Sequence, residues 1–301
     1  MPRISVLTPT YNRAEKLERL YHAVNKSTYR DFEWIIMNDG SKDHTEEVIK
    51  KIQEESDFPV IYRYQENSGK HVAMNRMYEI AQGEYCFTID DDDELLPETL
   101  AKGVAVIDRI SVEDREKYWC IVGRCIDGKT GEFIGIPYPD NINELTGGKQ
   151  KKALKVNGEC CSFKKTSIMK KFKFPEVKGC SYFPEGNLWN RLDEEYKQYY
   201  TNEIFRVYYR NDGESLVNYS KNKESYVRRY NMYRFLLSEE NPLKSKAFSR
   251  RHIAEIYKYR LFTDRLELSK KEVYSGISDF NKFVLWMSAI PCRMLQKKRK
   301  E

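Results

Sequence analysis

Apolar and polar positions alternate along the first hundred residues in a way that predicts strands and helices in turn. Short apolar runs with β-branched residues predict strands, and the segments between them place apolar residues at helical spacing. The expected strands are RISVLTPTY, FEWIIMND, VIYRYQEN and EYCFTID, and the expected helices are NRAEKLERLYHAV, SKDHTEEVIKKI and GKHVAMNRMYEIAQG. This alternation indicates right-handed βαβ units and a parallel sheet. Asn12, with Glu15 three residues later, predicts a capping box at the start of the first helix.

Beyond residue 100 the pattern loosens. LAKGVAVIDRI predicts a helix and YWCIVGRCID a strand, and residues 160–215 mix short strands with one expected helix, LWNRLDEEYKQY. From about residue 220 the chain is mainly helical in pattern, basic and rich in tyrosine. A chain of 301 residues can form more than one packed unit. We therefore expect an α/β half over residues 1–105, a second half over 106–219, and a helical C-terminal extension over 220–301.

Unusual polar clusters follow the expected strands. They are Thr8 to Asn12, Asn38 to Ser41, Asn67 to Lys70, and the run Asp90 to Asp93. In open α/β sheets, ligands bind outside the carboxyl ends of the strands. Clusters far apart in the sequence should therefore converge on one site.

The run of four aspartates raises the question of what stands opposite it, because like charges repel one another. One interpretation is a solvated acidic loop in which Asp93 or Glu94 caps the next helix. A divalent cation explains more, because Mg²⁺ and Mn²⁺ are commonly held by one or two carboxylates together with substrate phosphates. Such a site suits a nucleotide substrate.

Four motifs in the first hundred residues point to one particular protein family. TPTYNR, NDGSKD, ENSGKHVAMN and IDDDDELLP, in this order and spacing, resemble the family 2 glycosyltransferases of GT-A fold, which use nucleotide-sugar donors. The likeness covers residues 1 to about 100 most strongly and implies a Rossmann-like, mainly parallel sheet flanked by helices. It also implies Mn²⁺ or Mg²⁺ as cofactor, with Asp92 on the metal. The positions that it assigns to the nucleotide sugar are Thr8, Pro9, Tyr11, Asp39, Asn67, Lys70, Asp90 and Asp91.

A second landmark is CSYFPEGNLWNRL, residues 180–192. Members of the family carry an acidic pair one turn before a Trp and an Arg-Leu, and the second acid is the catalytic base, which maps onto Glu185. The chain departs from the pattern, because Pro184 stands where the first acid is usual and Glu replaces Asp at the second. The alternative role of Glu185 is a first-turn acid favoured by the helix dipole.

The resemblance implies transfer of a sugar from a UDP-sugar to an acceptor hydroxyl, with inversion. The acceptor class would be a growing cell-surface polysaccharide, a glycolipid or a glycoprotein glycan. Two other functions stay open at this point. A nucleotide-sugar-binding protein without turnover would explain the departure at Pro184. A nucleotidyltransferase shares the sheet and the acidic site, but its Gly-rich, basic loop after the first strand is missing.

Charge and cysteine content bear on location and partners. The seven cysteines include no CxxC pair, which favours a reducing cytoplasm, and the direct entry from Met1 into a strand argues against a secretory signal. Residues 220–301 carry 20 Lys+Arg against 9 Asp+Glu. The terminal stretch FNKFVLWMSAIPCRMLQKKRKE predicts an interfacial helix with a polybasic end, at the inner face of the cell membrane. A core-packing helix is the alternative, and no nucleic-acid motif accompanies the basic residues.

Overall fold

The chain folds into two compact units, which are described separately. In the computed structural model the described residues are 1–139, 143–145, 158–177, 180, 182–209, 223–238, 240–241 and 250–287. The first unit comprises Met1–Phe174 and Leu188–Asp212, and the second comprises Pro175–Asn187 and Gly213–Glu301. The finer division of the chain at residues 105 and 219 stays a prediction.

The first unit is built on one mixed sheet whose strand order is β3-β2-β1-β4-β7-β5-β8-β6. Its strands are β1 (Ile4–Thr10), β2 (Phe32–Asn38), β3 (Val60–Tyr64), β4 (Tyr85–Thr88), β5 (Tyr118–Asp127), β6 (Glu144–Leu145), β7 (Cys160–Lys165) and β8 (Lys197–Tyr208). The pairs β1–β2, β1–β4, β2–β3 and β5–β8 are parallel, whereas β7 runs antiparallel to β4 and β5, and β6 to β8. The predicted mainly parallel α/β sheet is therefore confirmed.

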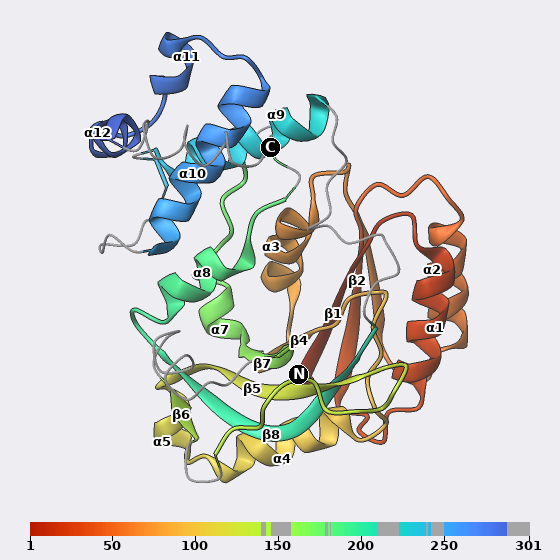
Figure 1. Cartoon of the computed structure of the whole chain (residues 1–301). Coiled ribbons are helices and arrows are strands. Elements are labelled where there is room, and N and C mark those ends of the chain that lie inside the picture. The colour runs from red at the N-terminus through yellow and green to blue at the C-terminus, as the bar shows by residue number, and fades with distance from the viewer. Residues whose placement is uncertain are drawn as a thin grey trace. The chain divides into compact units, whose positions relative to one another are not determined.

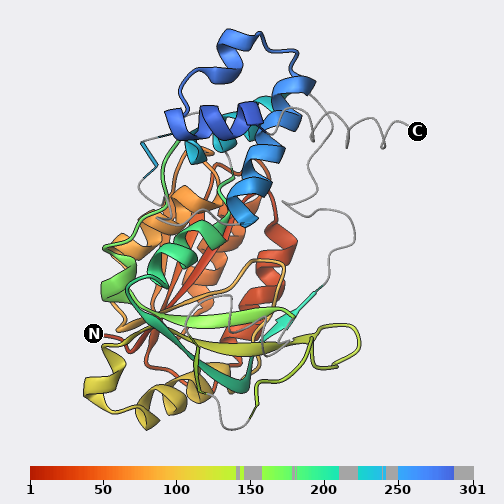
Figure 2. The same cartoon turned by 60° about the vertical axis from the view of Figure 1, so that its left-hand side comes forward.

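Helices cover both faces of this sheet. They are α1 (Ala14–Asn25), α2 (Thr45–Glu55), α3 (Lys70–Ile80), α4 (Thr99–Arg109), α5 (Val112–Arg115) and α7 (Thr166–Met169), followed by α8 (Glu185–Leu192). Figure 1 shows α1 and α2 on one side of β1 and β2 and α3 on the other. Figure 2 shows α4 alongside β5 and β8. Because both faces are covered, β1 and β2 are buried along their whole length, which explains their unbroken apolar runs.

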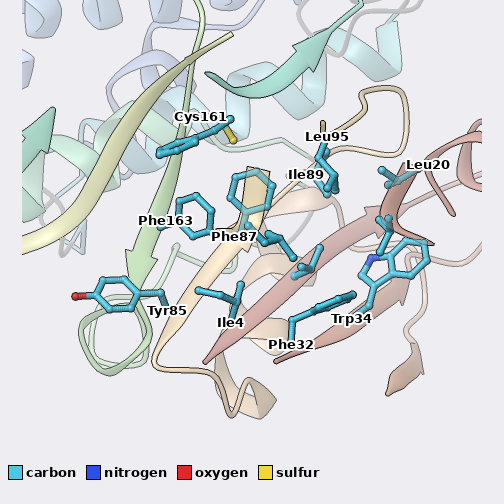
Figure 3. Close-up of a cluster of buried hydrophobic side chains, with 14 of the residues drawn as sticks. Ile4, Leu20, Phe32, Trp34, Tyr85, Phe87, Ile89, Leu95, Cys161 and Phe163 are labelled. Atoms are coloured by element: carbon cyan, nitrogen blue, oxygen red, sulfur yellow. The ribbon is translucent and has the colours of Figure 1, made fainter. Parts of the chain in front are cut away.

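The main core lies between the sheet and the helices α1, α2 and α4 (Figure 3). Ile4 of β1 and Phe32 of β2 contribute to it from the sheet. Trp34 stacks on Tyr21 of α1, with ring centroids 6.4 Å apart, and its indole N–H donates to the hydroxyl of Thr8 at 3.0 Å. The buried indole therefore has a polar partner, as buried Trp side chains usually do.

Gly103 in α4 gives a test of how tightly this core is packed. A methyl group on its Cα would lie 2.2 Å from the ring of Phe163, which is itself wedged between Phe87 and Phe205 at centroid distances of 4.6 and 4.9 Å. Helix propensity alone would make Gly103→Ala stabilising by about 1 kcal/mol, but overpacking costs about 1–3 kcal/mol. We expect a net loss of stability, measured as a lower midpoint of urea unfolding. Ala105→Gly, on the exposed side of α4, is the control for propensity alone, and a Gly103→Ala variant more stable than wild type would contradict the expectation.

Two local predictions are wrong. The helix α1 begins at Ala14 without a side-chain cap, and Asn12 instead adopts φ +51° and accepts a hydrogen bond from the Lys42 N–H at 2.7 Å. The helix expected over LWNRLDEEYKQY ends at Leu192, and the strand β8 begins at Lys197. Tyr is a strong strand former, and Gln198, within the expected helix, is buried in β8 next to Tyr199, so sheet packing decides the conformation at the end of this segment.

The second unit is helical, as predicted for the C-terminal extension. Its helices are α9 (Lys223–Leu236), α10 (Arg250–Arg265), α11 (Lys270–Tyr274) and α12 (Asp279–Met287). Tyrosines pack α9 against α10: Tyr233 stacks on Phe262, and Tyr230 stacks on Tyr259, whose hydroxyl donates to the Val273 carbonyl at 2.7 Å. The tyrosine-rich composition therefore serves packing here. Among the described residues, no helix is both long and apolar enough to cross a bilayer.

Candidate functional site

The polar clusters at the strand ends come together, as the sequence predicted. The N–H of Asp39 donates to the Thr10 carbonyl at 2.9 Å, and the Thr10 hydroxyl donates to Asp91 at 2.7 Å. Gly40, at φ +80°, packs so closely on Asn67 that a Cβ would lie 2.7 Å from the Asn67 nitrogen. The ends of β1, β2 and β4 and the loop after β3 thus form one polar site.

Each aspartate of the run Asp90–Asp93, which we call the acidic loop, contacts a basic side chain. Lys70, the first residue of α3, lies 2.7 Å from Asp90. One guanidinium nitrogen of Arg13 lies 2.8 Å from Asp91 and 2.9 Å from Asp92. Arg206 of β8 lies 3.2 Å from Asp93. These cations of the chain offset the repulsion among the four carboxylates.

The acidic loop has two buried and two accessible members. The side chains of Asp91 and Asp93 are 4% and 2% exposed, whereas those of Asp90 and Asp92 are 31% and 14% exposed. Burial raises the pKa of Asp91 to about 6 and that of Asp93 to about 7, against the opposing effect of Arg13 and Arg206. Burial acts in the same direction on Asp90, but Lys70 outweighs it and the pKa of Asp90 lies below its ordinary value.

The buried pair anchors the loop. Asp91 accepts from Thr10 with one oxygen and from Arg13 with the other. Asp93 accepts from the Tyr209 N–H at 3.2 Å in addition to its ion pair with Arg206. The backbone N–H groups and carbonyls of Glu94 and Val207 also bond reciprocally, at 2.7 and 3.1 Å. The acidic loop is thus fixed to β1 on one side and to the end of β8 on the other, and the predicted ligand contact of Asp91 stays a prediction.

A divalent cation fits the geometry of this loop. Asp90, Asp92 and Asp93 each place one carboxylate oxygen within 4.8 Å of the others. Carboxylate oxygens are the donors that Mg²⁺ and Mn²⁺ prefer. All three carboxylates pair with basic side chains, but Asp93 is buried whereas Asp90 and Asp92 are partly exposed. Asp90 and Asp92 are therefore the better placed for a metal that enters from solvent.

The residues expected to hold the nucleoside differ in their surroundings. Thr8 and Pro9 are buried within β1, and the Thr8 hydroxyl accepts from Trp34. Tyr11, just after β1, is 42% exposed, and Asn67 is also exposed. Of the three positions assigned in the first strand segment, Tyr11 is therefore the one whose side chain is open to a ligand.

Asp39 organises the loop that carries Asn67. Its carboxylate accepts from the Gln65 amide at 2.6 Å, from the Ser68 N–H at 2.8 Å and from the Gly69 N–H at 2.9 Å. The side chain is 5% exposed. Asp39 therefore fixes the loop between β3 and α3, and its predicted contact with the nucleotide sugar stays a prediction.

We expect Asp39→Asn to loosen this loop. The amide keeps only one acceptor oxygen for three donors, so at least one N–H loses its partner, at a cost of about 1–3 kcal/mol. Urea unfolding should show that loss, and the KM for the nucleotide-sugar donor that the resemblance implies should rise while kcat changes less. Asp57→Asn is the matched control, because Asp57 is 68% exposed and its ion pair with Arg30 is worth little. Unchanged stability and KM would show that the loop does not depend on Asp39.

Glu185 belongs to the second unit, whereas the acidic loop belongs to the first. It is the first residue of α8 and is partly buried. Its role as a base stays a prediction.

Arg13 and Arg206 contact the acidic loop, although the sequence pattern does not mark them as site residues. Arg13 stands within TPTYNR, directly after the first strand, so its nearness to the acidic loop follows from the parallel pairing of β1 and β4. Arg206 has no such local signal, because only the fold brings β8 to Asp93.

Comparison with known proteins gives a family match and full-length likenesses. The family model for glycosyl transferase family 2 matches residues 5–132. The GalNAc(5)-diNAcBac-PP-undecaprenol beta-1,3-glucosyltransferase of Campylobacter jejuni is 28% identical over 99% of this chain and 96% of its own length. The uncharacterized glycosyltransferase YibD of Escherichia coli is 35% identical, but over only 39% of this chain and 35% of its own.

Solved structures resemble the whole fold. S. aureus TarS 1–349 in complex with UDP-GlcNAc has a TM-score of 0.56 at 18% identity and matches 96% of this chain and 79% of its own. Mannosyltransferase PcManGT from Pyrobaculum calidifontis, in complex with GDP-Man and Mn²⁺, has a TM-score of 0.52 at 16% identity, over 98% and 83% of the two chains. At these identities the likeness concerns the fold.

Proposed function

Because the chain is a family 2 glycosyltransferase of GT-A fold, we propose that it transfers a hexose or hexosamine from a UDP-sugar to a lipid-linked glycan, with a divalent cation and with inversion. The observation that carries this proposal is the acidic loop at the carboxyl ends of the strands. It sets the accessible carboxylates of Asp90 and Asp92 beside Lys70 and beside the loop that Asp39 organises. This arrangement offers oxygen ligands for a metal and a cation for a diphosphate at one place.

The acceptor class rests on the relative that spans the chain. The name of the Campylobacter jejuni protein describes an oligosaccharide on a polyprenyl diphosphate as its substrate, and its likeness extends over both units of this chain. An acceptor of this kind is held in a membrane by its lipid. We therefore assign the reaction to the surface of a membrane, and the cytoplasmic face stays the expectation from the sequence.

The chemistry follows from the residues. Asp90 and Asp92 would hold the cation, which when bound supplies positive charge beside the leaving diphosphate. Lys70, at the start of α3, adds a second positive charge there. Glu185 takes the proton of the acceptor hydroxyl as that oxygen bonds to the anomeric carbon. The bond from the anomeric carbon to the diphosphate breaks at the same time, and UDP leaves on the opposite face, so the configuration inverts.

The test is a donor screen with the full chain. UDP-glucose, UDP-galactose, UDP-GlcNAc, UDP-GalNAc and GDP-mannose are each incubated with Mn²⁺ or Mg²⁺ and a polyprenyl-diphosphate-linked oligosaccharide. We expect one UDP-sugar to yield UDP and a glycolipid heavier by one sugar residue, and EDTA to stop both. Full activity in EDTA would remove the metal from the proposal. Tight UDP-sugar binding without UDP release would favour a binding protein, and pyrophosphate release from a nucleoside triphosphate would favour a nucleotidyltransferase.

A further inference from the structure

The helix α12 presents an aromatic face to solvent. Phe280, Phe283 and Trp286 are 54%, 58% and 64% exposed and follow one another at intervals of three residues, so they lie along one side of the helix. The rings of Phe283 and Trp286 lie 6.4 Å apart. The other large apolar side chains that the described structure exposes are Met1, Tyr11, Tyr64, Val112, Ile136 and Val227, none of which shares a helix with another.

The opposite side of α12 fixes this orientation. Leu285 is fully buried, and the buried Asn281 donates from its amide to the Leu237 carbonyl at 2.7 Å. The Ser278 N–H donates to the same carbonyl at 3.0 Å. The helix therefore cannot turn its aromatic face inward without breaking buried hydrogen bonds. The interfacial helix predicted from FNKFVLWMSAIPCRMLQKKRKE contains all three side chains, but the structure separates the buried Leu285 from the exposed rings of Phe283 and Trp286.

The charge of the sequence that follows α12 indicates which kind of partner this aromatic face would bind. Residues 288–301, which follow α12 and lie outside the described residues, contain Arg293, Lys297, Lys298, Arg299 and Lys300 against Glu301. Aromatic side chains partition into the interface of a bilayer, and clustered basic residues are attracted to anionic lipid. A second copy of this chain carries the same excess of basic residues, so its charge does not favour it as the partner.

We propose that α12 docks on the surface of an anionic phospholipid bilayer, with Phe283 and Trp286 inserted among the lipids. The biological purpose rests on the proposed function, since docking would deliver the enzyme to a lipid-linked acceptor. The docking itself is measured without any substrate.

The experiment is co-sedimentation of the full chain with vesicles of phosphatidylglycerol and phosphatidylcholine, or of phosphatidylcholine alone. We expect binding to the anionic vesicles that falls with added salt and leaves a residual part, because salt screens charge within about 8 Å at physiological ionic strength but does not weaken apolar insertion. The double variant Phe283→Ser/Trp286→Ser should bind at least about tenfold more weakly, a loss of about 1.4 kcal/mol. Its melting temperature should stay that of wild type, because both side chains are exposed.

Controls separate this result from other causes. Val112→Ser, at a position 74% exposed in the first unit, should bind vesicles as wild type does. Truncation after Met287 should remove the salt-sensitive part of binding and keep α12 in place. A truncation that also removes α12, such as one after Asp279, would not serve as a control, because it would take the buried Leu285 out of the core.

Three outcomes would overturn the proposal. They are equal pelleting of wild type and double variant, a fall in the melting temperature of the double variant, or a wild-type dimer that the substitutions dissolve. UDP release in the absence of vesicles, with a short-chain water-soluble acceptor, reports the proposed function independently. A chain that pellets with vesicles but releases no UDP would refute the function and leave the docking intact.

Discussion

Asp92→Ala is expected to abolish sugar transfer and metal-dependent nucleotide binding while the fold stays intact. Asp92 is one of the two accessible carboxylates of the acidic loop and contributes one oxygen to the cluster that suits a metal. A bound metal contributes several kcal/mol of transition-state stabilisation, and each 1.36 kcal/mol, roughly, is tenfold in rate, so the loss should be at least about 10³-fold. Turnover with saturating Mn²⁺ and calorimetric titration of UDP with and without metal measure it.

Stability should hardly change, and this separates a lost ligand from a lost fold. In the variant Arg13 keeps its ion pair with Asp91 at 2.8 Å, and one fewer carboxylate repels the others. We expect less than about 1 kcal/mol of change in the unfolding free energy. Glu94→Gln is the matched control. Glu94 directly follows the acidic loop and pairs with Arg19 of α1, but it is not part of the oxygen cluster. Near-wild-type turnover of Asp92→Ala with Mn²⁺ would refute the metal assignment.

The sequence predicts well those features that depend on local pattern and on the topology of a parallel sheet. The apolar run of β1 and the helical spacing in α1 and α2 are each visible within a short stretch of sequence. Once the strands are taken as parallel, the meeting of Thr10, Asp39 and the acidic loop follows, because carboxyl ends of parallel strands share one edge. This is why the candidate site could be outlined without coordinates.

What the sequence does not predict depends on contacts across long separations. Asp93 is held by the Tyr209 N–H, 116 residues away, and by Arg206, and no periodicity near either partner indicates the pairing. The capping box at Asn12 failed for a related reason, because the Asn12 side chain bonds to the Lys42 N–H on the next loop. In both cases a hydrogen bond between residues far apart in the sequence determines the local conformation. The same competition decides the start of β8, where burial of Gln198 in the sheet overrides a helix-like pattern.

The basic residues of the site change how its aspartates are interpreted. From the sequence, the four carboxylates are alike and a metal is the obvious counter-charge. In the structure, Arg13 and Arg206 anchor the buried pair. Asp90 and Asp92 also pair with Lys70 and Arg13, but their side chains stay partly exposed and can be reached by a ligand. The loop is thus rigid where it is buried and chemically available where it is exposed. Preorganisation of this kind is what electrostatic catalysis requires.

Glu185→Gln should bind the UDP-sugar normally and turn over at least about a hundredfold more slowly, as expected for a lost general base. The amide keeps the shape of the side chain and its hydrogen-bonding capacity but cannot take the proton of the acceptor hydroxyl. Glu185 is also the first residue of α8, where an acidic side chain contributes about 0.3–1 kcal/mol through the helix dipole, so a small loss of stability is expected as well. Melting curves of both proteins keep that loss apart from the loss of rate.

The matched control is Glu194→Gln, which removes a carboxylate that lies just beyond the end of α8 and 3.5 Å from Arg191. It should leave kcat unchanged, because no role in proton transfer is assigned to it. A fall confined to KM, with kcat intact, would make Glu185 a residue that positions the acceptor. The departure from the family pattern at Pro184 and Glu185 would then have moved the base to another carboxylate of the chain.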